Sequence, residues 1–326
     1  MLTNSFFLKY LCWILAATTL FLKSGKNSAY ICVFFLCILF TLQDDFGDLF
    51  HYKAAFNHGI YVSEIGFELL QGAIKLIPLP SNYLFQFIKL TPVLIFFLTP
   101  RKYGRMLLPI IVSQFMFLSV FIGLRQGIAA SIILVGILWV YENKILGFLL
   151  LALAGFFHES AFFVAALFYI IYFLRISRLN FIIISIFLIF FLLFLSHILP
   201  DILGKYQDYI RSSVFDFRVS RFNPYFKLII SISYFILTFK YSDYKDNSIL
   251  STIAKNRFLF FLLSISFLIF FDSSELASRI FLYFLAFDTL FFSYLIANNI
   301  KQYRIGFYFL SIVIAPNVIT FLKINN

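Results

Sequence analysis

Residues 145–174 read ILGFLLLALAGFFHESAFFVAALFYIIYFL, an apolar run with one polar insert, His-Glu-Ser, at 158–160. A helix that crosses a bilayer needs about 20 apolar residues, with a range of roughly 17–25. The insert therefore divides the run into two short apolar helices, 145–157 and 161–174. We expect the first to be broken or re-entrant, because irregular backbone is tolerated at membrane depth where it lines a polar cavity.

The composition extends this interpretation to the whole chain. Of its 326 residues, 62% are hydrophobic, 13% are charged and 49 are Phe. A soluble domain carries about 25% charged residues, so this chain has too few to cover a soluble core. Cys12, Cys32 and Cys37 lie in apolar runs, as small core residues without disulfides. We therefore expect an all-α polytopic membrane protein with one integral-membrane domain, 1–326.

Apolar runs predict about 12 transmembrane helices. They cover 6–22, 29–43, 83–99, 106–124, 127–142, 145–157, 161–174, 181–199, 225–240, 257–271, 280–297 and 304–322. Lys and Arg gather in cytoplasmic loops. One assignment of the loops to the two sides of the membrane places more of these residues on a single side than any other assignment does. Its cytoplasmic residues are Lys23, Lys26, Arg101, Lys102, Arg105, Lys144, Arg175, Arg178, Lys240, Lys245, Lys255, Arg257, Lys301 and Arg304. Both termini are then periplasmic.

The periplasmic face in this assignment receives two long loops, 44–82 and 200–224, and the turns near 125, 158–160 and 272–279. It also receives eleven of the fifteen acidic residues: Asp44, Asp45, Asp48, Glu64, Glu68, Glu159, Asp201, Asp208, Asp216, Asp272 and Glu275. The net charge of +11 is then mostly an orientation signal. Its basic residues are scattered among spans, so we expect no nucleic-acid partner.

Nucleotide and metal motifs are missing from the sequence. It has no Walker loop, dinucleotide fingerprint or kinase set, and its four histidines lack paired zinc-ligand spacing. Asp44, Asp45 and Asp48 can hold a divalent ion, although a carboxylate cluster at a helix end is the commoner interpretation. We expect no metal and no cofactor.

Arg125 and His158 are candidate functional residues at the periplasmic ends of apolar helices. A charged arginine costs about 2.5–3.5 kcal/mol at the bilayer centre, so Arg125 faces a cavity, an anion or the interface. The small residues Gly127, Ala129 and Ala130 let other backbones approach beside it. His158 is suited to accept a proton near neutral pH; the alternative is a histidine that caps a helix end.

Other ionisable residues suit an anionic lipid headgroup on the same face. Arg279 resembles Arg125, as a cation at the mouth of an apolar helix, and the long loop adds Arg211, Arg218 and Arg221. Guanidinium groups match phosphate oxygens in bidentate pairs; the alternative for the loop arginines is a solvated charged loop. Asp288 lies deep in a span and needs a partner inside the bundle, unless it is protonated there.

These residues belong to motifs that resemble one known family. In chain order the motifs are Asp48-x-x-x-Tyr52, Glu64-x-Gly-Phe-Glu-Leu-Leu, Arg125-Gln-Gly-Ile-Ala, Phe157-His158-x-Ser160-Ala and Arg279-Ile-Phe-x-Tyr283-Phe. Their order and spacing over roughly residues 44–290 resemble the EpsG family, which belongs with the Wzy-type O-antigen and capsule polymerases. The stretch 175–257 has no motif that aligns.

The resemblance implies a glycosyltransferase of the bacterial inner membrane that works on its periplasmic face. Such enzymes move a growing glycan from undecaprenyl diphosphate onto a new lipid-linked repeat unit, without nucleotide sugar or metal, beside a chain-length regulator. We assign Arg125 and Arg279 to the diphosphate and His158 to the base. We expect Asp48, Tyr52 and Glu64 to bind sugar hydroxyls, or one carboxylate to be the base instead.

Three alternatives to a polymerase remain open. A lipid-linked oligosaccharide flippase shares the lipid substrate but needs a hydrophilic passage to both faces, and few polar residues lie near the cytoplasmic side. A glycan ligase fits the same motifs with a different acceptor. A purely structural membrane protein does not explain arginines at the periplasmic ends of several helices.

Overall fold

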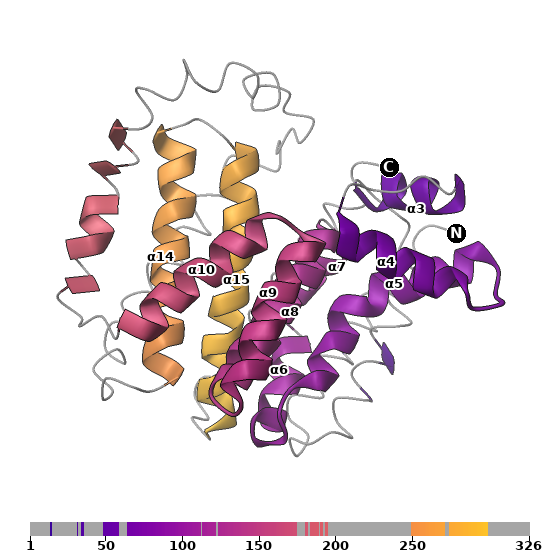
Figure 1. The fold of residues 1–326 in the computed structure, drawn as a ribbon, viewed down its shortest axis with the longest axis horizontal. Helices are drawn as coiled ribbons and strands as arrows, with labels where there is room; N and C mark the ends of the chain where they lie inside the picture. Colours follow the sequence, from indigo (N-terminus) through magenta and orange to yellow (C-terminus); the bar gives the residue numbers. More distant parts are fainter. Residues whose placement is uncertain are drawn as a thin grey trace. The chain divides into compact units, whose positions relative to one another are not determined.

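The computed structural model of the chain is helical, and the part of the chain that it describes contains no strand (Figure 1). The described residues fall into two compact units, one within 1–165 and 289–326 and the other within 166–288. Whether these units form the single membrane domain expected from the sequence stays a prediction. The residues described are 14, 31, 34–35, 48–58, 64–111, 113–121, 123–174, 180–181, 183–188, 190–191, 193–194, 249–270 and 274–298.

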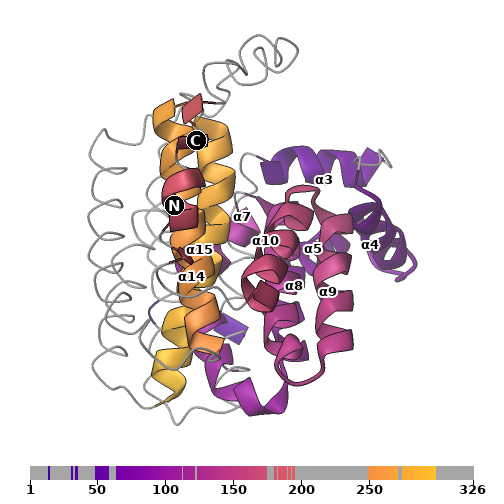
Figure 2. The same cartoon turned by 60° about the vertical axis from the view of Figure 1, so that its left-hand side comes forward.

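Helix α8 (Leu124–Val140) is the centre of the first unit. Its sequence has no polar face, and all its residues except Arg125 and Trp139 are buried. A helix that is apolar all round has to be covered on every side. Neighbouring helices cover α8, which packs against α9 (Lys144–Phe157) and also against α5 and α7 (Figures 1 and 2).

Glycines bring α8 and α9 into close contact. A Cβ on Gly136 would lie 3.2 Å from the carbonyl oxygen of Gly147, and a Cβ on Gly147 would overlap the backbone nitrogen of Val140. Small residues allow two helix backbones to approach in this way. A short turn joins the two helices. In it, the side chain of Asn143 accepts a hydrogen bond from the backbone N–H of Leu146 and so caps α9.

The stretch 44–82, predicted as a long periplasmic loop, contains helices α3 (Asp48–His58) and α4 (Ile65–Lys75), and its periplasmic location stays a prediction. Helix α4 buries the face that includes Phe67 and Gln71 and exposes the opposite one. A helix with one buried face and one exposed face is typical of packing on a protein surface. A search for long apolar runs therefore misses it.

The predicted span 106–124 is also wrong as one helix, because it is broken into α6 (Leu107–Ile111) and α7 (Gln114–Phe121). Between them the hydroxyl of Ser113 donates to the carbonyl oxygen of Ile110 at 2.6 Å and accepts from the backbone N–H of Met116 at 3.3 Å. Serine is a favoured helix cap for this reason.

The other predicted helices in the described part of the chain are confirmed. Their observed counterparts are α5 (Ser81–Ile95) with the 3-10 turn η2 (Phe96–Leu98), α8, α9, α10 (Ser160–Leu174), α14 (Ile249–Phe270) and α15 (Ser274–Ala297). Among the described residues, two segments can cross a membrane by length and composition, Ser81–Leu98 and Arg279–Ala297; α8, α9 and α10 are shorter apolar helices. The predicted spans 6–22, 29–43, 225–240 and 304–322 lie outside the described residues, and 181–199 lies partly outside them.

Polar side chains mark the end of α8 that is farther from Arg125. The 3-10 helix η3 (Arg101–Met106) lies there, and Lys102 contacts Glu142 at 2.9 Å. Burial, together with the Glu142 carboxylate, raises the pKa of Tyr103 to about 12. At 1.5 Å per residue, Arg125 and Glu142 are separated by about 25 Å along α8. The periplasmic placement of Arg125 and the cytoplasmic placement of Lys102 stay predictions.

We expect Lys102→Ala to lower the free energy of unfolding by less than about 1 kcal/mol, because exposed ion pairs contribute little. Its side chain is 67% exposed. Glu142→Ala should cost more, about 1–3 kcal/mol, since it also leaves the buried Tyr103 hydroxyl without its acceptor. Thermal unfolding of the purified protein in detergent measures both, and equal shifts for the two variants would contradict this ranking.

A buried ion pair links two helices of the second unit, α14 and α15. The Nε atom of Arg257 on α14 lies 2.5 Å from Oδ1 of Asp288 on α15, and Arg257 is 2% exposed. Beside this pair the rings of Phe260 and Phe287 stack at 5.3 Å. The expectation that Asp288 needs a partner inside the bundle is confirmed. The placement of Arg257 in a cytoplasmic loop is wrong, because α14 begins at Ile249.

Candidate functional site

Arg125 lies in the first turn of α8, where the backbone is held close to α7. A Cβ on Gly127 would overlap backbone atoms of Ser119, so the two chain segments are in direct contact there. The expectation that Gly127, Ala129 and Ala130 allow a close approach is confirmed at Gly127, and both alanines are fully buried. The start of α8 is therefore fixed by packing, and the Arg125 side chain extends from a rigid position.

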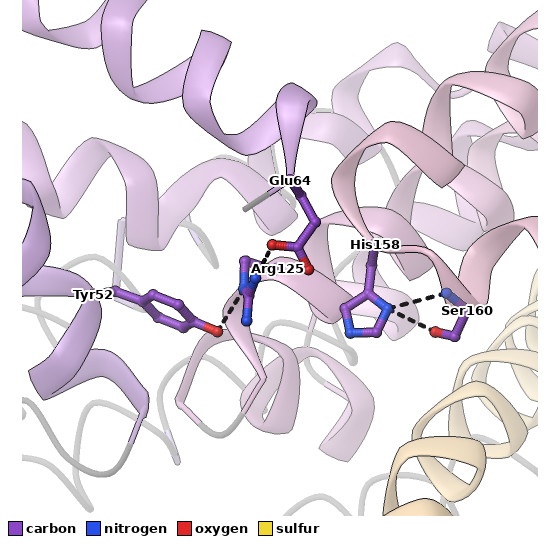
Figure 3. A network of polar contacts seen from close by, with 5 residues as sticks. All are labelled: Tyr52, Glu64, Arg125, His158 and Ser160. Atoms are coloured by element: carbon purple, nitrogen blue, oxygen red, sulfur yellow. Dashed lines mark hydrogen bonds and ion pairs between the residues drawn. The ribbon is translucent and has the colours of Figure 1, made fainter. Parts of the chain in front are cut away.

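Two side chains from the segment before α5 hold the guanidinium of Arg125 (Figure 3). The carboxylate of Glu64 forms an ion pair with Nη1, and Nε donates a hydrogen bond to the hydroxyl of Tyr52 at 2.7 Å. The guanidinium carbon also lies 5.1 Å from the centre of the Tyr52 ring. An arginine has five N–H donors, so the Nη2 donors are not used by these contacts.

Tyr52 and Glu64 are themselves positioned by packing. Tyr52, on α3, is 8% exposed and its ring lies 5.5 Å from that of Phe67 on α4. Glu64 is the residue before α4, and its side chain makes no hydrogen bond to that helix. An acidic residue there normally caps its own helix. Here the carboxylate is directed to Arg125 instead, with only 13% of its side chain exposed.

His158 forms the turn between α9 and α10, with an extended backbone (φ −161°, ψ 124°). Its Nδ1 atom accepts a hydrogen bond from the backbone N–H of Ser160 at 3.3 Å and lies 2.7 Å from the Ser160 hydroxyl oxygen (Figure 3). A Cβ on Gly155 would overlap the ring of Phe162, so the two helices diverge from a tight turn. The predicted polar insert is thus a turn between two helices.

The packing of α4 on α9 brings the Glu64 and His158 segments together. A Cβ on Gly66 would lie 2.9 Å from the carbonyl oxygen of Phe156 and 3.0 Å from the ring of Phe157. The start of α4 therefore lies against the end of α9. Figure 3 shows the result, with His158 beside Glu64 and Tyr52 on the other side of Arg125.

Four of the predicted site residues thus gather from three distant segments: Tyr52, Glu64, Arg125 and His158. Asp48 is the first residue of α3, the helix that also contains Tyr52. Arg279 is partly buried near the start of α15 in the second unit. The remaining predicted residues, Arg211, Arg218 and Arg221, lie outside the described residues.

Within the described residues no three His, Cys, Asp or Glu side chains come together. Asp44 and Asp45, the other members of the candidate carboxylate cluster, lie outside that part of the chain.

The sequence analysis missed Gln71 and the role of Ser160. Gln71 is fully buried on α4, one turn after Phe67, and neither of its amide atoms has a hydrogen-bond partner among the described residues. Its spacing from Phe67 places it on the buried face of α4. The hydroxyl of Ser160, the first residue of α10, contacts His158. In the sequence, only the i, i+2 spacing of His158 and Ser160 indicated that these two side chains are in contact.

Comparison with known proteins identifies a family for this chain. The family model described as the EpsG family matches residues 26–325. No curated protein and no solved structure matches the chain. The matched region includes every motif residue from Asp48 to Tyr283.

Proposed function

This chain belongs to the EpsG family, and we propose that it is a polysaccharide polymerase that extends O-antigen, capsule or exopolysaccharide chains. The family consists of membrane proteins of polysaccharide biosynthesis that are similar to Wzy-type polymerases. The proposed reaction moves a growing glycan from undecaprenyl diphosphate onto a new lipid-linked repeat unit. The observation that supports it most is the convergence of Arg125, Glu64, Tyr52 and His158 at one end of the α8–α9 hairpin.

The reaction that we propose is a displacement at the anomeric carbon of the donor sugar. A hydroxyl oxygen of the acceptor sugar forms the new bond, and the bond from the anomeric carbon to the diphosphate breaks. The electron pair leaves with the diphosphate, and the hydroxyl proton passes to a base. Direct displacement would invert the anomeric centre. The leaving group is already stable, so the main requirement is a fixed positive charge beside it.

We propose that Arg125, in the first unit, supplies this fixed positive charge. Tyr52 and Glu64 orient its guanidinium, and the Nη2 donors remain for two phosphate oxygens. Because the group is held before substrate arrives, it stabilises the developing charge without reorganising. We propose Arg279 as a second diphosphate ligand, on the basis of its partial burial at the start of the apolar segment Arg279–Ala297.

Other substrate contacts are proposed from residue chemistry. Asp48, Tyr52 and Glu64 are suited to sugar hydroxyls, and Arg211, Arg218 and Arg221 to the charged headgroup. We place the reaction at the periplasmic face of the inner membrane. The supporting observation is that Arg125 and the basic residue Lys102 lie at opposite ends of α8. A chain-length regulator as partner rests on the family resemblance alone.

A polysaccharide gel of a deletion strain tests the proposal. Deletion should replace the ladder of long chains by single repeat units, and the wild-type chain should restore it. Arg279→Ala should insert into the membrane normally but fail to restore the ladder. If the lipid-linked units instead accumulate on the cytoplasmic face, the protein is a flippase. Long chains that form but stay on their lipid carrier would identify a ligase.

A further inference from the structure

The contact between Ser160 and His158 determines which ring nitrogen of the histidine bears the proton. A backbone N–H can only donate, so Nδ1 of His158 must accept the bond from the Ser160 N–H with its lone pair. The Ser160 hydroxyl, 2.7 Å from the same atom, then donates to it as well. A neutral imidazole has a single N–H, which is therefore on Nε2.

The electrostatics of α10 favour the same tautomer. Ser160 is the first residue of α10, and the exposed N–H groups of a helix N-terminus have a partial positive charge. A proton on Nδ1 would face this charge and would displace the bond from the Ser160 N–H. Both effects keep Nδ1 unprotonated.

This arrangement is the reverse of that in a histidine base. In the Ser-His-Asp triad a carboxylate accepts a hydrogen bond from Nδ1–H, which leaves a lone pair on Nε2 for the incoming proton. The direction of the Ser160 N–H bond to Nδ1 favours the opposite tautomer in this chain, with Nδ1 as the acceptor and Nε2 as the donor. The second nitrogen of a histidine is set by the partner of the first, so Ser160 determines what His158 offers to a substrate.

We propose that Ser160 is a positioning residue that holds His158 as a hydrogen-bond donor, whose Nε2–H binds an anionic oxygen of the lipid-linked diphosphate beside Arg125. This assignment rests on the proposed polymerase function. The proton of the attacking hydroxyl then passes to a carboxylate, and of the two candidates, Asp48 and Glu64, we choose Glu64 because it lies beside Arg125.

Three substitutions of His158 separate a donor from a base, in the full chain reconstituted with a polyprenyl-diphosphate-linked repeat unit. Gln places an amide N–H near the position of Nε2 but cannot act as a base. We expect His158→Gln to stay within about 10-fold of wild type and His158→Ala and His158→Asn to lose about 100-fold or more, the range of one preorganised donor. Equal loss in the Gln and Ala variants would overturn the proposal.

The tautomer itself can be measured without turnover. Nitrogen NMR of the chain labelled at histidine, with the His158 signal identified by its loss in His158→Gln, should show Nε2 protonated and Nδ1 unprotonated. Ser160→Thr should keep this signal and the activity, whereas Ser160→Ala should broaden it toward both tautomers and lower turnover several-fold. A wild-type signal with Nδ1 protonated would overturn the proposal.

The proposed function and the proposed tautomer fail differently. A wild-type chain that makes no ladder in the reconstituted assay contradicts the proposed function, whatever the tautomer. A wild-type chain that polymerises, together with a protonated Nδ1, contradicts only the positioning of His158 by Ser160.

Discussion

Replacing Arg125 by alanine should lower polymerisation about 100- to 1,000-fold, the effect of removing one preorganised charge-stabilising group. The guanidinium is held by Glu64 and Tyr52 before substrate binds, so its loss removes both the charge and the fixed geometry. Arg125→Lys should recover only a small part of the activity. An ammonium group cannot make the planar set of contacts to a carboxylate, a phenol and a phosphate together. The measurement is ladder formation by the reconstituted protein.

Loss of Arg125 also leaves the partly buried Glu64 carboxylate without its counter-ion, which by itself destabilises the fold. The double variant Arg125→Ala with Glu64→Gln removes this unpaired charge and serves as the control. We expect it to unfold at nearly the wild-type temperature and still fail to polymerise. Because Glu64 is also the proposed base, this double variant tests stability alone; if it unfolded well below the wild-type temperature, Arg125 would support the fold by more than its ion pair with Glu64.

The Glu64–Arg125 pair shows what the sequence could and could not predict about the site. Each residue was identifiable from its type and place, because a permanent cation and a carboxylate beside apolar helices need a polar partner or a ligand. Their mutual contact was not, since it depends on α4 and on the direction of one side chain at its start. Helix α4 was not visible among the long apolar runs that reveal membrane spans.

The length of apolar runs accounts both for the helices that were predicted correctly and for those that were not. Apolar length identified α8, α9 and α15, because a helix without a polar face has to be buried or to contact lipid. It could not detect the break at Ser113, where a single hydroxyl supplies both a cap and a stop. Apolar length also predicted the start of α14 too late. A charged residue such as Arg257 is typical of a loop, and its partner Asp288 on α15 allows it to lie inside a helix.

Glycine spacing was the part of the sequence that most directly predicted a contact. Gly127 was expected to let another backbone approach Arg125, and that backbone is Ser119 on α7. The identity of the neighbour was beyond the sequence, because α7 was expected to be continuous with α6. The same contact offers a way to disturb the site without changing any polar group.

Gly127→Ala should destabilise the protein by about 1–3 kcal/mol, the usual range for overpacking a well-packed contact. The new Cβ would overlap backbone atoms of Ser119, which cannot rotate away as a side chain would. Helices α7 and α8 must then separate at the turn that bears Arg125. We therefore expect polymerisation to fall together with the unfolding temperature, and Gly127→Leu to have a larger effect on both.

Gly72→Ala on α4 is the matched control, because a Cβ there meets no atom within 4 Å. Alanine is favoured over glycine in a helix by roughly 0.5–1 kcal/mol, so this variant should unfold at a slightly higher temperature with unchanged activity. If Gly127→Ala lowers the unfolding temperature and Gly72→Ala raises it, the loss at Gly127 comes from the contact with Ser119 and not from helix propensity. Full stability and full activity in Gly127→Ala would mean that α7 does not support Arg125.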